Sequence, residues 1–258
     1  GGSITCNDQN ANENYAALVL SKEAKNGKIT ANGVTFDIKG DSKKASNAAT
    51  GGVITIDGST DDVSVVVAYI SYGNNSYTFT SIEEAIKFAK AGDVVTIMPG
   101  TYPVPAMKAG IIVEGEGEVL LEGTLGGTLE NLTLKNLHIK GGNAQRWAYG
   151  KGNLVFENVT FEATSVYALH FDGITAGTNL TYKNCTIIGW AAMGGSPESC
   201  TFEGCTFKGN GSYGLIRTYF DATIKDCTFD VANVNTSDIY EDGIHAVDGA
   251  KVTVENCT

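Results

Sequence analysis

A unit of eight residues recurs along the second half of the chain, and it constrains the fold more than any other feature. Its copies begin at residues 132, 154, 180, 200, 222 and 252, so the spacings are 22, 26, 20, 22 and 30 residues. The first copy reads Leu-Thr-Leu-Lys-Asn-Leu-His-Ile, and the last is cut short at Thr258. A fixed unit joined by segments of variable length indicates stacked structural repeats. The shortened last copy leads us to expect either a piece of a longer protein or a last coil that is capped by something outside this chain.

The pattern inside the unit predicts two strands and a corner. Apolar residues stand at positions one, three, six and eight, and each pair has the period of two that is typical of a strand. The phase breaks between positions three and six, so both strands face one interior only if the chain turns there. Position five is filled by residue types that suit such a turn. They are Asn136, Asn158, Asn184, Gly204, Asp226 and Asn256.

Stacked corners of this kind predict an all-β fold, a right-handed parallel β-helix whose corner amides form a ladder. A series of antiparallel hairpins, the alternative, gives no reason for one corner residue to return. We expect this domain over residues 71–258, with coils over about 93–258. A short amphipathic helix at about 81–90 is predicted to cap the open end of the stack, with Ser81 and Glu84 in a capping box.

Residues 1–70 lack the repeat. Four apolar runs there read as strands between polar turns. This part is predicted to be a small N-terminal β-rich module, either sandwich-like or composed of extra strands that lead into the β-helix.

Two segments near the start of the predicted stack carry a resemblance to a known family. They read SIEEAI from Ser81 and AGDVVTIMPGTY up to Tyr102. This sequence resembles the entry segment of the pectin lyase-like superfamily, including surface proteins of gut bacteria, and the resemblance covers about residues 70–258. It implies the fold rather than an activity, because the superfamily contains lyases, hydrolases, epimerases, adhesins and phage tailspikes.

The charge of the chain argues against several classes of partner. The net charge is −11, whereas nucleic acids and anionic membranes bind basic surfaces. We therefore expect no nucleic-acid partner. No apolar run approaches the roughly 18 residues of a membrane span, so we expect no membrane insertion. An acidic polysaccharide would need a local basic patch or bound calcium.

The cysteines are predicted to be reduced. There are six, namely Cys6, Cys185, Cys200, Cys205, Cys227 and Cys257. Four of them occupy position six of the unit, where they would stack side by side in the core as small apolar residues. A single row does not converge on one point as zinc ligands must.

The third segment of each coil carries the candidate site. In the resembled fold, substrates bind along the outer surface of this segment. If Leu169, Ile216 and Ile244 point inward, an outward row results that contains Trp147, His170, Arg217 and His245. The side chains expected nearby are Tyr149, Tyr167, Tyr213 and Tyr219. Aromatic rings stack on sugars, and Arg or His binds hydroxyl and carboxylate groups. Ordinary solvated side chains on a strand face remain the alternative.

Catalysis and metal binding are left open by the sequence. His170, Arg217 and His245 are the catalytic candidates, because a lyase needs a base and a cation. Calcium, the one cofactor left open, has the candidates Asp238, Glu241, Asp242 and Asp248. The additional Arg and Lys residues of pectate lyases and the Arg-Ile-Lys of polygalacturonases are missing. A carboxylate pair for hydrolysis would have to join Asp172 to Asp242 or Asp248.

Together these features predict an extracellular or surface-displayed bacterial β-helix that binds a polysaccharide or surface glycan, as in a fragment of an adhesin. One alternative is a polysaccharide lyase or glycoside hydrolase that acts along the same face. The other is a structural phage or cell-surface fibre module in which the row has no binding role. Oligomerisation is left open.

Overall fold

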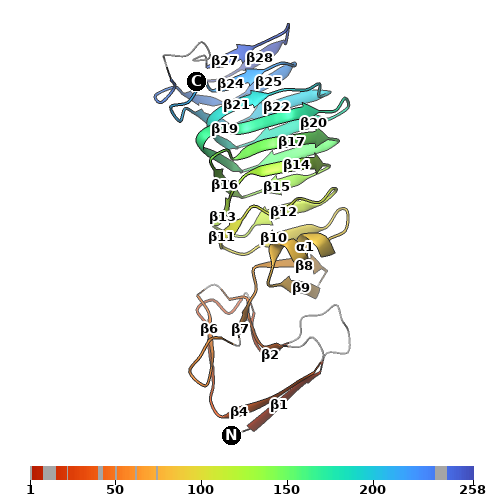
Figure 1. Ribbon diagram of the computed structural model, residues 1–258, viewed down its shortest axis with the longest axis vertical. Helices are drawn as coiled ribbons and strands as arrows, with labels where there is room; N and C mark the ends of the chain where they lie inside the picture. The colour runs from red at the N-terminus through yellow and green to blue at the C-terminus, as the bar shows by residue number, and fades with distance from the viewer. Residues whose placement is uncertain are drawn as a thin grey trace. The chain divides into compact units, whose positions relative to one another are not determined.

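The computed structural model describes residues 2–7, 16–21, 23–39, 43–49, 51–61, 63–73, 75–235 and 243–258. The chain forms two compact units (Figure 1). The first contains residues 1–88 with 96–99, and the second contains residues 89–95 with 100–258. Strand β10 (Val94–Ile97) passes from one unit to the other. The second unit holds the repeat.

The second unit is a stack of coils whose first strands form one sheet (Figure 1). In order along the sheet, they are β12 (Ile112–Gly115), β15 (Thr133–Lys135), β18 (Asn153–Glu157), β20 (Asn179–Lys183), β22 (Ser199–Glu203), β25 (Ala222–Lys225) and β28 (Val252–Glu255). Each strand pairs in parallel with the next, without a register shift. The predicted parallel β-helix is confirmed, and the alternative of antiparallel hairpins is wrong.

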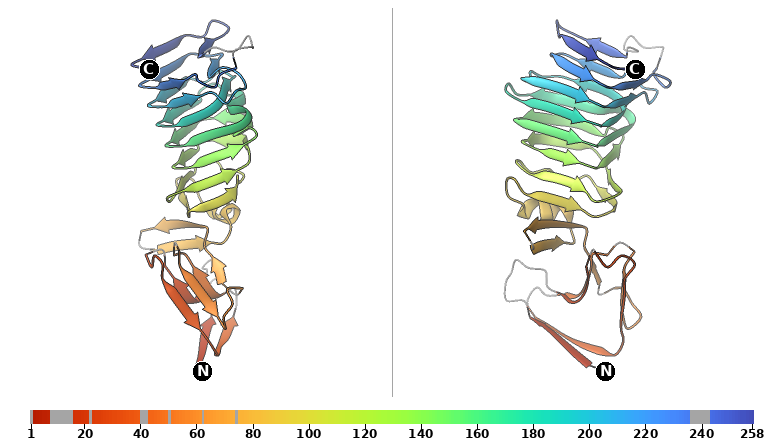
Figure 2. Two further views of the ribbon diagram at one scale, coloured as in Figure 1. Left: turned by 90° about the vertical axis from the view of Figure 1, so that its left-hand side faces the viewer. Right: turned by 180° about the vertical axis from the view of Figure 1, so that it is seen from behind.

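The other strands complete the coils, which Figure 2 shows from two further sides. The second strands are β11 (Gly100–Pro103), β13 (Val119–Glu122), β16 (His138–Gly141), β23 (Thr206–Lys208) and β26 (Thr228–Asp230). The third strands are β14 (Leu125–Glu130), β17 (Gln145–Lys151), β24 (Ile216–Thr218) and β27 (Ile244–Ala246). Two longer strands, β19 (Thr160–Ile174) and β21 (Thr186–Met193), supply both the second and the third strand of their coils.

The predicted corners lie where the first strand passes to the second. All six corner residues have positive φ angles, between 51° and 63°. Asn158 donates a hydrogen bond from Nδ2 to Oδ1 of Asn136 at 3.1 Å, which is one rung of the predicted ladder. At Gly204, a Cβ atom would lie 2.5 Å from Oδ1 of Asn184. Glycine is therefore required there by the neighbouring rung as well as by its φ angle.

A second polar ladder lies at the start of the first strands, and it was not predicted. Asn179 donates from Nδ2 to Oδ1 of Asn153 at 3.0 Å, and Ser199 donates from Oγ to Oδ1 of Asn179 at 2.7 Å. The backbone N–H of Asn153 bonds to Oδ1 of Asn131 at 3.0 Å. The coils of Asn136 and Asn158 are thus joined by side chains at both ends of their first strands.

The core consists of inward columns of apolar side chains. Phe156, Tyr182 and Phe202 occupy position three of successive coils and are in register. Their rings are fully buried and stacked, with centroids 4.8 Å and 4.6 Å apart. Phe161 and Phe207 approach this stack edge-on from the second strands. Stacked and edge-to-face rings contribute energy beyond the area that they bury, so this column is a main source of stability.

Position four of the unit faces outward and alternates in charge from coil to coil. Register pairs join the residues in the order Glu114, Lys135, Glu157, Lys183, Glu203, Lys225 and Glu255. The Nζ of Lys135 lies 3.0 Å from Oε2 of Glu157, and that of Lys183 lies 3.9 Å from Oε2 of Glu203. Exposed pairs of this kind add little energy individually, but opposite charges across a pair favour this register over like charges.

The cysteines whose side chains the structure describes are free thiols, as predicted. Cys185, Cys200, Cys205 and Cys227 are buried, and Cys257 is partly buried. Along the row, the backbone N–H of Cys205 donates to Sγ of Cys227 at 3.3 Å. The neighbouring thiol of Cys185, together with burial, raises the pKa of Cys205 to about 12. Cys205 therefore serves as a core side chain rather than as a nucleophile.

The first unit begins with seven strands that pair only in parallel. They are β1 (Gly2–Asn7), β2 (Ala16–Leu20), β3 (Lys28–Ala31), β4 (Val34–Lys39), β5 (Lys43–Asn47), β6 (Val53–Ile56) and β7 (Val63–Val65). The partners are β1 with β4, β2 with β5, β3 with β6, and β5 with β7. Strands β4, β5 and β6 thus join three small sheets in the same order as β1, β2 and β3, and β7 then joins the sheet of β2 and β5. A β-sandwich is built from antiparallel sheets, so the sandwich-like alternative is wrong.

A hairpin and a short helix complete the first unit. Strands β8 (Ala68–Tyr72) and β9 (Asn75–Phe79) are antiparallel, and helix α1 (Ile82–Phe88) follows. Oγ of Ser81 accepts the N–H of Glu84 at 3.3 Å, as predicted for an N-cap. The same hydroxyl donates to Oε2 of Glu83 at 2.8 Å, so Glu83 is its acidic partner instead of Glu84. The capping role of this helix stays a prediction.

Candidate functional site

The third strands place four residues in one row across successive coils. His170 pairs with Ala192, Ala192 pairs with Arg217, and Arg217 pairs with His245. The residue before each of the first three is buried, because side chains alternate across a strand. Leu169, Ala191 and Ile216 are at most 1% exposed. The row that joins His170, Arg217 and His245 therefore faces outward, with Ala192 as a member that the sequence did not point to.

A hollow of about 500 Å³ opens over three of these coils. One coil contributes Tyr167, His170, Phe171 and Asp172, the next contributes Trp190, Ala192 and Gly194, and the third contributes Tyr213, Arg217 and Tyr219. The middle coil has only a methyl group and a hydrogen atom where its neighbours have long side chains. The hollow thus arises because Ala192 and Gly194 leave a gap between His170 and Arg217.

Aromatic rings form one wall of the hollow. Tyr167 and Trp190 are stacked, with centroids 5.4 Å apart and 19° between the planes. Trp190 and Tyr213 continue the wall at 4.6 Å. His170 packs against Tyr167 with a centroid distance of 4.4 Å. Three coils thus share a continuous aromatic surface, and Tyr219, 39% exposed, lies near the opposite side of the row.

Both arginines of the chain lie at this face, although the net charge is −11. The guanidinium carbon of Arg217 lies 4.9 Å from the centroid of Tyr219. That of Arg146 lies 4.9 Å from the centroid of Trp147 and 5.0 Å from that of Tyr167. Contact with aromatic faces holds each guanidinium in place. The result is a local concentration of positive charge on an acidic protein.

His170 and Asp172 form a polar pair within the hollow. Nδ1 of His170 lies 3.6 Å from Oδ2 of Asp172. Burial lowers the pKa of His170 below its ordinary value, Arg146 lowers it further, and Asp172 acts in the opposite direction. The imidazole is therefore neutral at pH 7, and a neutral imidazole is able to accept a proton or a hydrogen bond.

Two further aromatic side chains lie one coil before the hollow. Trp147 is 60% exposed and Tyr149 is 53% exposed. Strand β17 has a bulge at this point. Gln145 pairs with Leu125 and Ala148 with Gly127, so β17 has one residue more than β14 between these two pairs. Ala148 pairs with Phe171, the residue after His170, so Trp147 lies beside the predicted row.

Of the predicted binding residues, Tyr167, Tyr213 and Tyr219 line the hollow together with His170 and Arg217. Trp147 and Tyr149 lie beside it, and His245 continues the row on the other side. The roles of all these residues in binding or catalysis stay predictions.

Of the predicted calcium ligands, Asp248 alone lies within the described residues. Asp238, Glu241 and Asp242 lie outside the described residues. Asp248 is exposed in a turn after β27, with a φ angle of 56°. Within the described ranges, no group of three or more His, Cys, Asp or Glu side chains is arranged to hold a metal ion. Of the carboxylates that a hydrolase could pair with Asp172, Asp242 lies outside the described residues, and Asp248 does not line the hollow.

Trp190 and Arg146 are site residues that the sequence prediction missed. Trp190-Ala-Ala-Met193 forms the third strand of its coil. It belongs to the long strand β21, which also supplies the second strand of that coil. A signal was present, because a tryptophan and two alanines stand between the segments of Tyr167 and Tyr213. Arg146 precedes the predicted Trp147, and its part in the site depends on the bulge.

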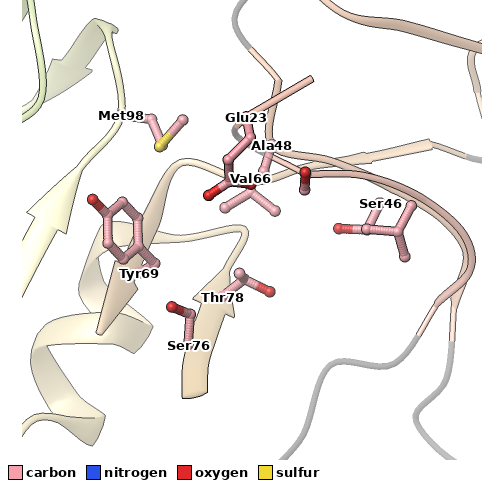
Figure 3. Close-up of a pocket in the computed structure, with 10 residues that line it drawn as sticks. Glu23, Ser46, Ala48, Val66, Tyr69, Ser76, Thr78 and Met98 are labelled. Atoms are coloured by element: carbon pink, nitrogen blue, oxygen red, sulfur yellow. The ribbon is translucent and has the colours of Figure 1, made fainter. Parts of the chain in front are cut away.

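A smaller hollow of about 200 Å³ lies in the first unit (Figure 3). Hydroxyl groups of Ser46, Ser76 and Thr78 line it together with apolar side chains such as Val66 and Met98. Among its described lining residues, Glu23 is the one charged residue and Tyr69 the one aromatic residue. The hollow of the second unit has a stack of rings and an arginine, so it is the better candidate for a site.

Comparisons with known proteins identify the fold and leave the activity open. The family model described as a right-handed beta helix region matches residues 109–258, which is more than half of the chain. This match supports the resemblance to the pectin lyase-like superfamily. No match is found among curated proteins or solved structures. In the described part of the chain, every helix is too short or too polar to cross a membrane.

Proposed function

Since the chain belongs to the right-handed β-helix family, we propose that it is a glycan-binding protein whose site is the three-coil hollow around Ala192. One observation carries this proposal. The stacked rings of Tyr167, Trp190 and Tyr213 form a wall beside a gap that His170 and Arg217 flank. An aromatic wall beside hydrogen-bonding groups matches a sugar ring, which has apolar faces and a polar edge.

The size and the chemistry of the hollow agree with this ligand. Its volume of about 500 Å³ is within the range of roughly 300–1,000 Å³ that is usual for ligand sites. The guanidinium of Arg217 can donate hydrogen bonds to a sugar in a fixed fork, and the carboxylate of Asp172 can accept hydrogen bonds from sugar hydroxyl groups. Because polysaccharides and surface glycans are found mostly outside cells, the proposal includes an extracellular or surface-displayed location, as in an adhesin.

A polysaccharide lyase is the second candidate, and the His170–Asp172 pair favours it. A neutral imidazole next to a carboxylate is a suitable base, and Arg217 would stabilise the negative charge that forms as the proton leaves. In that reaction the base takes a proton next to the sugar carboxylate. The bond to the leaving sugar then breaks, a C–C double bond forms, and the oxygen of the leaving sugar takes a proton from water. A hydrolase receives less support, because Asp172 is the one carboxylate among the described residues that line the hollow.

A glycan panel assayed for both binding and cleavage tests these candidates. Ala192→Leu fills the gap and retains every polar group, so it should abolish binding of any glycan held in the hollow. Arg217→Ala should weaken binding by about tenfold or more, as expected for the loss of a charge-assisted hydrogen bond. Thr201→Leu, on the outer surface of the first-strand sheet, is the matched control and should bind as the wild type does.

Each outcome separates the candidates. Binding without a product supports the glycan-binding protein, whereas unsaturated products that His170→Ala abolishes support the lyase. A protein that forms trimers and binds no glycan would instead be a structural fibre module. Wild-type affinity in Ala192→Leu would show that the hollow is not the binding site.

A further inference from the structure

Trp147 combines two features that are costly for a tryptophan. Its side chain is 60% exposed, which is the highest value among the described aromatic side chains. Its backbone has a φ angle of 52°, and the other non-glycine residues with positive φ angles are all Asn or Asp. A bulky residue in this region is a genuine outlier, and such outliers concentrate at functional sites.

The preceding coil is shaped to accept this conformation. Gly126 and Gly127 lie opposite the bulge on β14. A Cβ atom on Gly126 would lie 2.7 Å from the carbonyl oxygen of Arg146. Gly127 has a φ angle of 77° and open space where its Cβ would be. Two glycines thus leave room for the bulge that turns the indole ring outward.

Arg146 joins this exposed ring to the hollow. Its guanidinium carbon lies 4.9 Å from the centroid of Trp147 and 5.0 Å from that of Tyr167, which is the first ring of the aromatic wall. On the same strand, the ring of Tyr149 lies against Gly173, where a Cβ atom would be 3.3 Å from Cδ1 of the tyrosine. Gly173 is next to Asp172 of the hollow. The two exposed rings are therefore continuous with the hollow.

We infer that Trp147 and Tyr149 form a second sugar-stacking subsite, one coil away from the hollow, and that the ligand is a chain of several sugars lying across the coils. This inference rests on the proposed glycan-binding function. Adjacent coils are about 4.8 Å apart, close to the length of one sugar residue in an extended chain. A ligand that fills the hollow therefore reaches Trp147 only if it is extended by further sugars.

The inference is tested with a disaccharide and a hexasaccharide cut from the polysaccharide that gives the strongest signal on the panel. Wild-type protein should bind the hexasaccharide about tenfold more tightly than the disaccharide, a difference that one stacked ring can supply. Trp147→Asn should remove this difference and leave the affinity for the disaccharide unchanged. Asn tolerates the left-handed backbone, so the variant should fold at least as well as the wild type. Trp147→Phe retains a ring and should retain most of the difference.

Fluorescence quenching gives a second readout that a purely structural role would not change. The chain has two tryptophans, and Trp190 is only 8% exposed, so acrylamide quenches mainly Trp147. The hexasaccharide should protect this fluorescence, whereas the disaccharide should not.

Equal loss of affinity for both ligands in Trp147→Asn, or no loss for either, overturns the second subsite. The proposed function still holds in that case if Ala192→Leu abolishes binding of both ligands. If Ala192→Leu leaves both affinities unchanged, the proposed function fails and the second subsite fails with it.

Discussion

The first-strand sheet and the third strands of the β-helix follow different rules, although both belong to the same coils. Along the first-strand sheet, from β12 to β28, neighbouring strands pair in register without a shift. Among the third strands, register shifts occur between β14 and β17, between β17 and β19, and between β19 and β21. The hollow and the exposed tryptophan lie where these shifts occur.

The difference shows how a repeat protein separates stability from binding. The first strands and their corners repeat one solution, with stacked rings inside and polar ladders at the ends. Because these coils are held in register there, the third strands tolerate bulges and missing side chains. Bulges are common next to functional sites, where they redirect a side chain.

The largest effect is expected in the regular region. Phe202→Ala removes a fully buried ring that stacks on Tyr182 at 4.6 Å and meets Phe207 edge-on. The free energy of unfolding should fall by about 3–5 kcal/mol, as is usual for the loss of a buried phenylalanine. Denaturant unfolding followed by far-UV circular dichroism measures this change.

Tyr219→Ala is the matched substitution on the other face, and its cost should be below about 1 kcal/mol because the side chain is 39% exposed. Similar costs for the two variants would contradict the proposed separation of stability from binding.

A smaller effect is expected from adding a single methyl group at a glycine. Gly204→Ala places a Cβ atom 2.5 Å from Oδ1 of Asn184, in a backbone with a φ angle of 63°. The free energy of unfolding should fall by about 1–2 kcal/mol or more, because an alanine is strained there and the ladder must shift. In Gly194→Ala, the Cβ would meet only the carbonyl oxygen of Phe171 at 3.5 Å. That variant should change the free energy of unfolding by no more than about 0.5 kcal/mol. A larger loss of stability in Gly194→Ala than in Gly204→Ala would contradict the view that the regular region provides the stability.

The smallest effect concerns pH. The pKa of His170 in the folded protein is lower than its ordinary value of 6.5, chiefly because of burial. Between pH 6.5 and the lowered pKa, the unfolded chain therefore holds a proton that the folded chain lacks. Stability contributed by the neutral imidazole is complete above pH 6.5 and is lost as the pH falls through this window.

Thermal unfolding from neutral pH to about pH 5 should thus show a smaller decrease in Tm for His170→Asn than for the wild type. Asp172→Asn provides the complementary variant. The Asp172 carboxylate raises the pKa of His170, so its loss should make the decrease steeper. Parallel profiles for all three proteins would show that this pair is too exposed to affect folding.

The repeat predicted the regular region well for a physical reason. Strand period and corner chemistry are local, so the sequence from Leu132 to Ile139 contains both the inward residues and the left-handed Asn136. The same alternation placed Leu169 inside and His170 outside, and it joined His170, Arg217 and His245 in one row. These predictions required only that successive coils stack in register.

The remaining features depend on contacts between coils that no local pattern reveals. The bulge at Trp147 requires the glycines of the preceding coil, so Arg146 was not expected to reach Tyr167. The hollow exists because the side chain of Ala192 is only a methyl group, and an alanine in a strand does not indicate a binding site in the sequence. The sequence of residues 1–70 lacks the eight-residue unit, so the parallel pairing of Ala45 with Leu18 and Val63 was not evident from spacing.

The alternating charges at position four divide the coils into two kinds, lysine coils and glutamate coils, that follow each other in turn. Coils that carry Lys135, Lys183 or Lys225 have only glutamate coils as neighbours. Removing one coil would bring two like charges together, whereas removing two adjacent coils would leave the alternation unbroken. The stack is therefore shortened or lengthened most easily by pairs of coils, so the pair, rather than the single coil, is the natural module for engineering this protein.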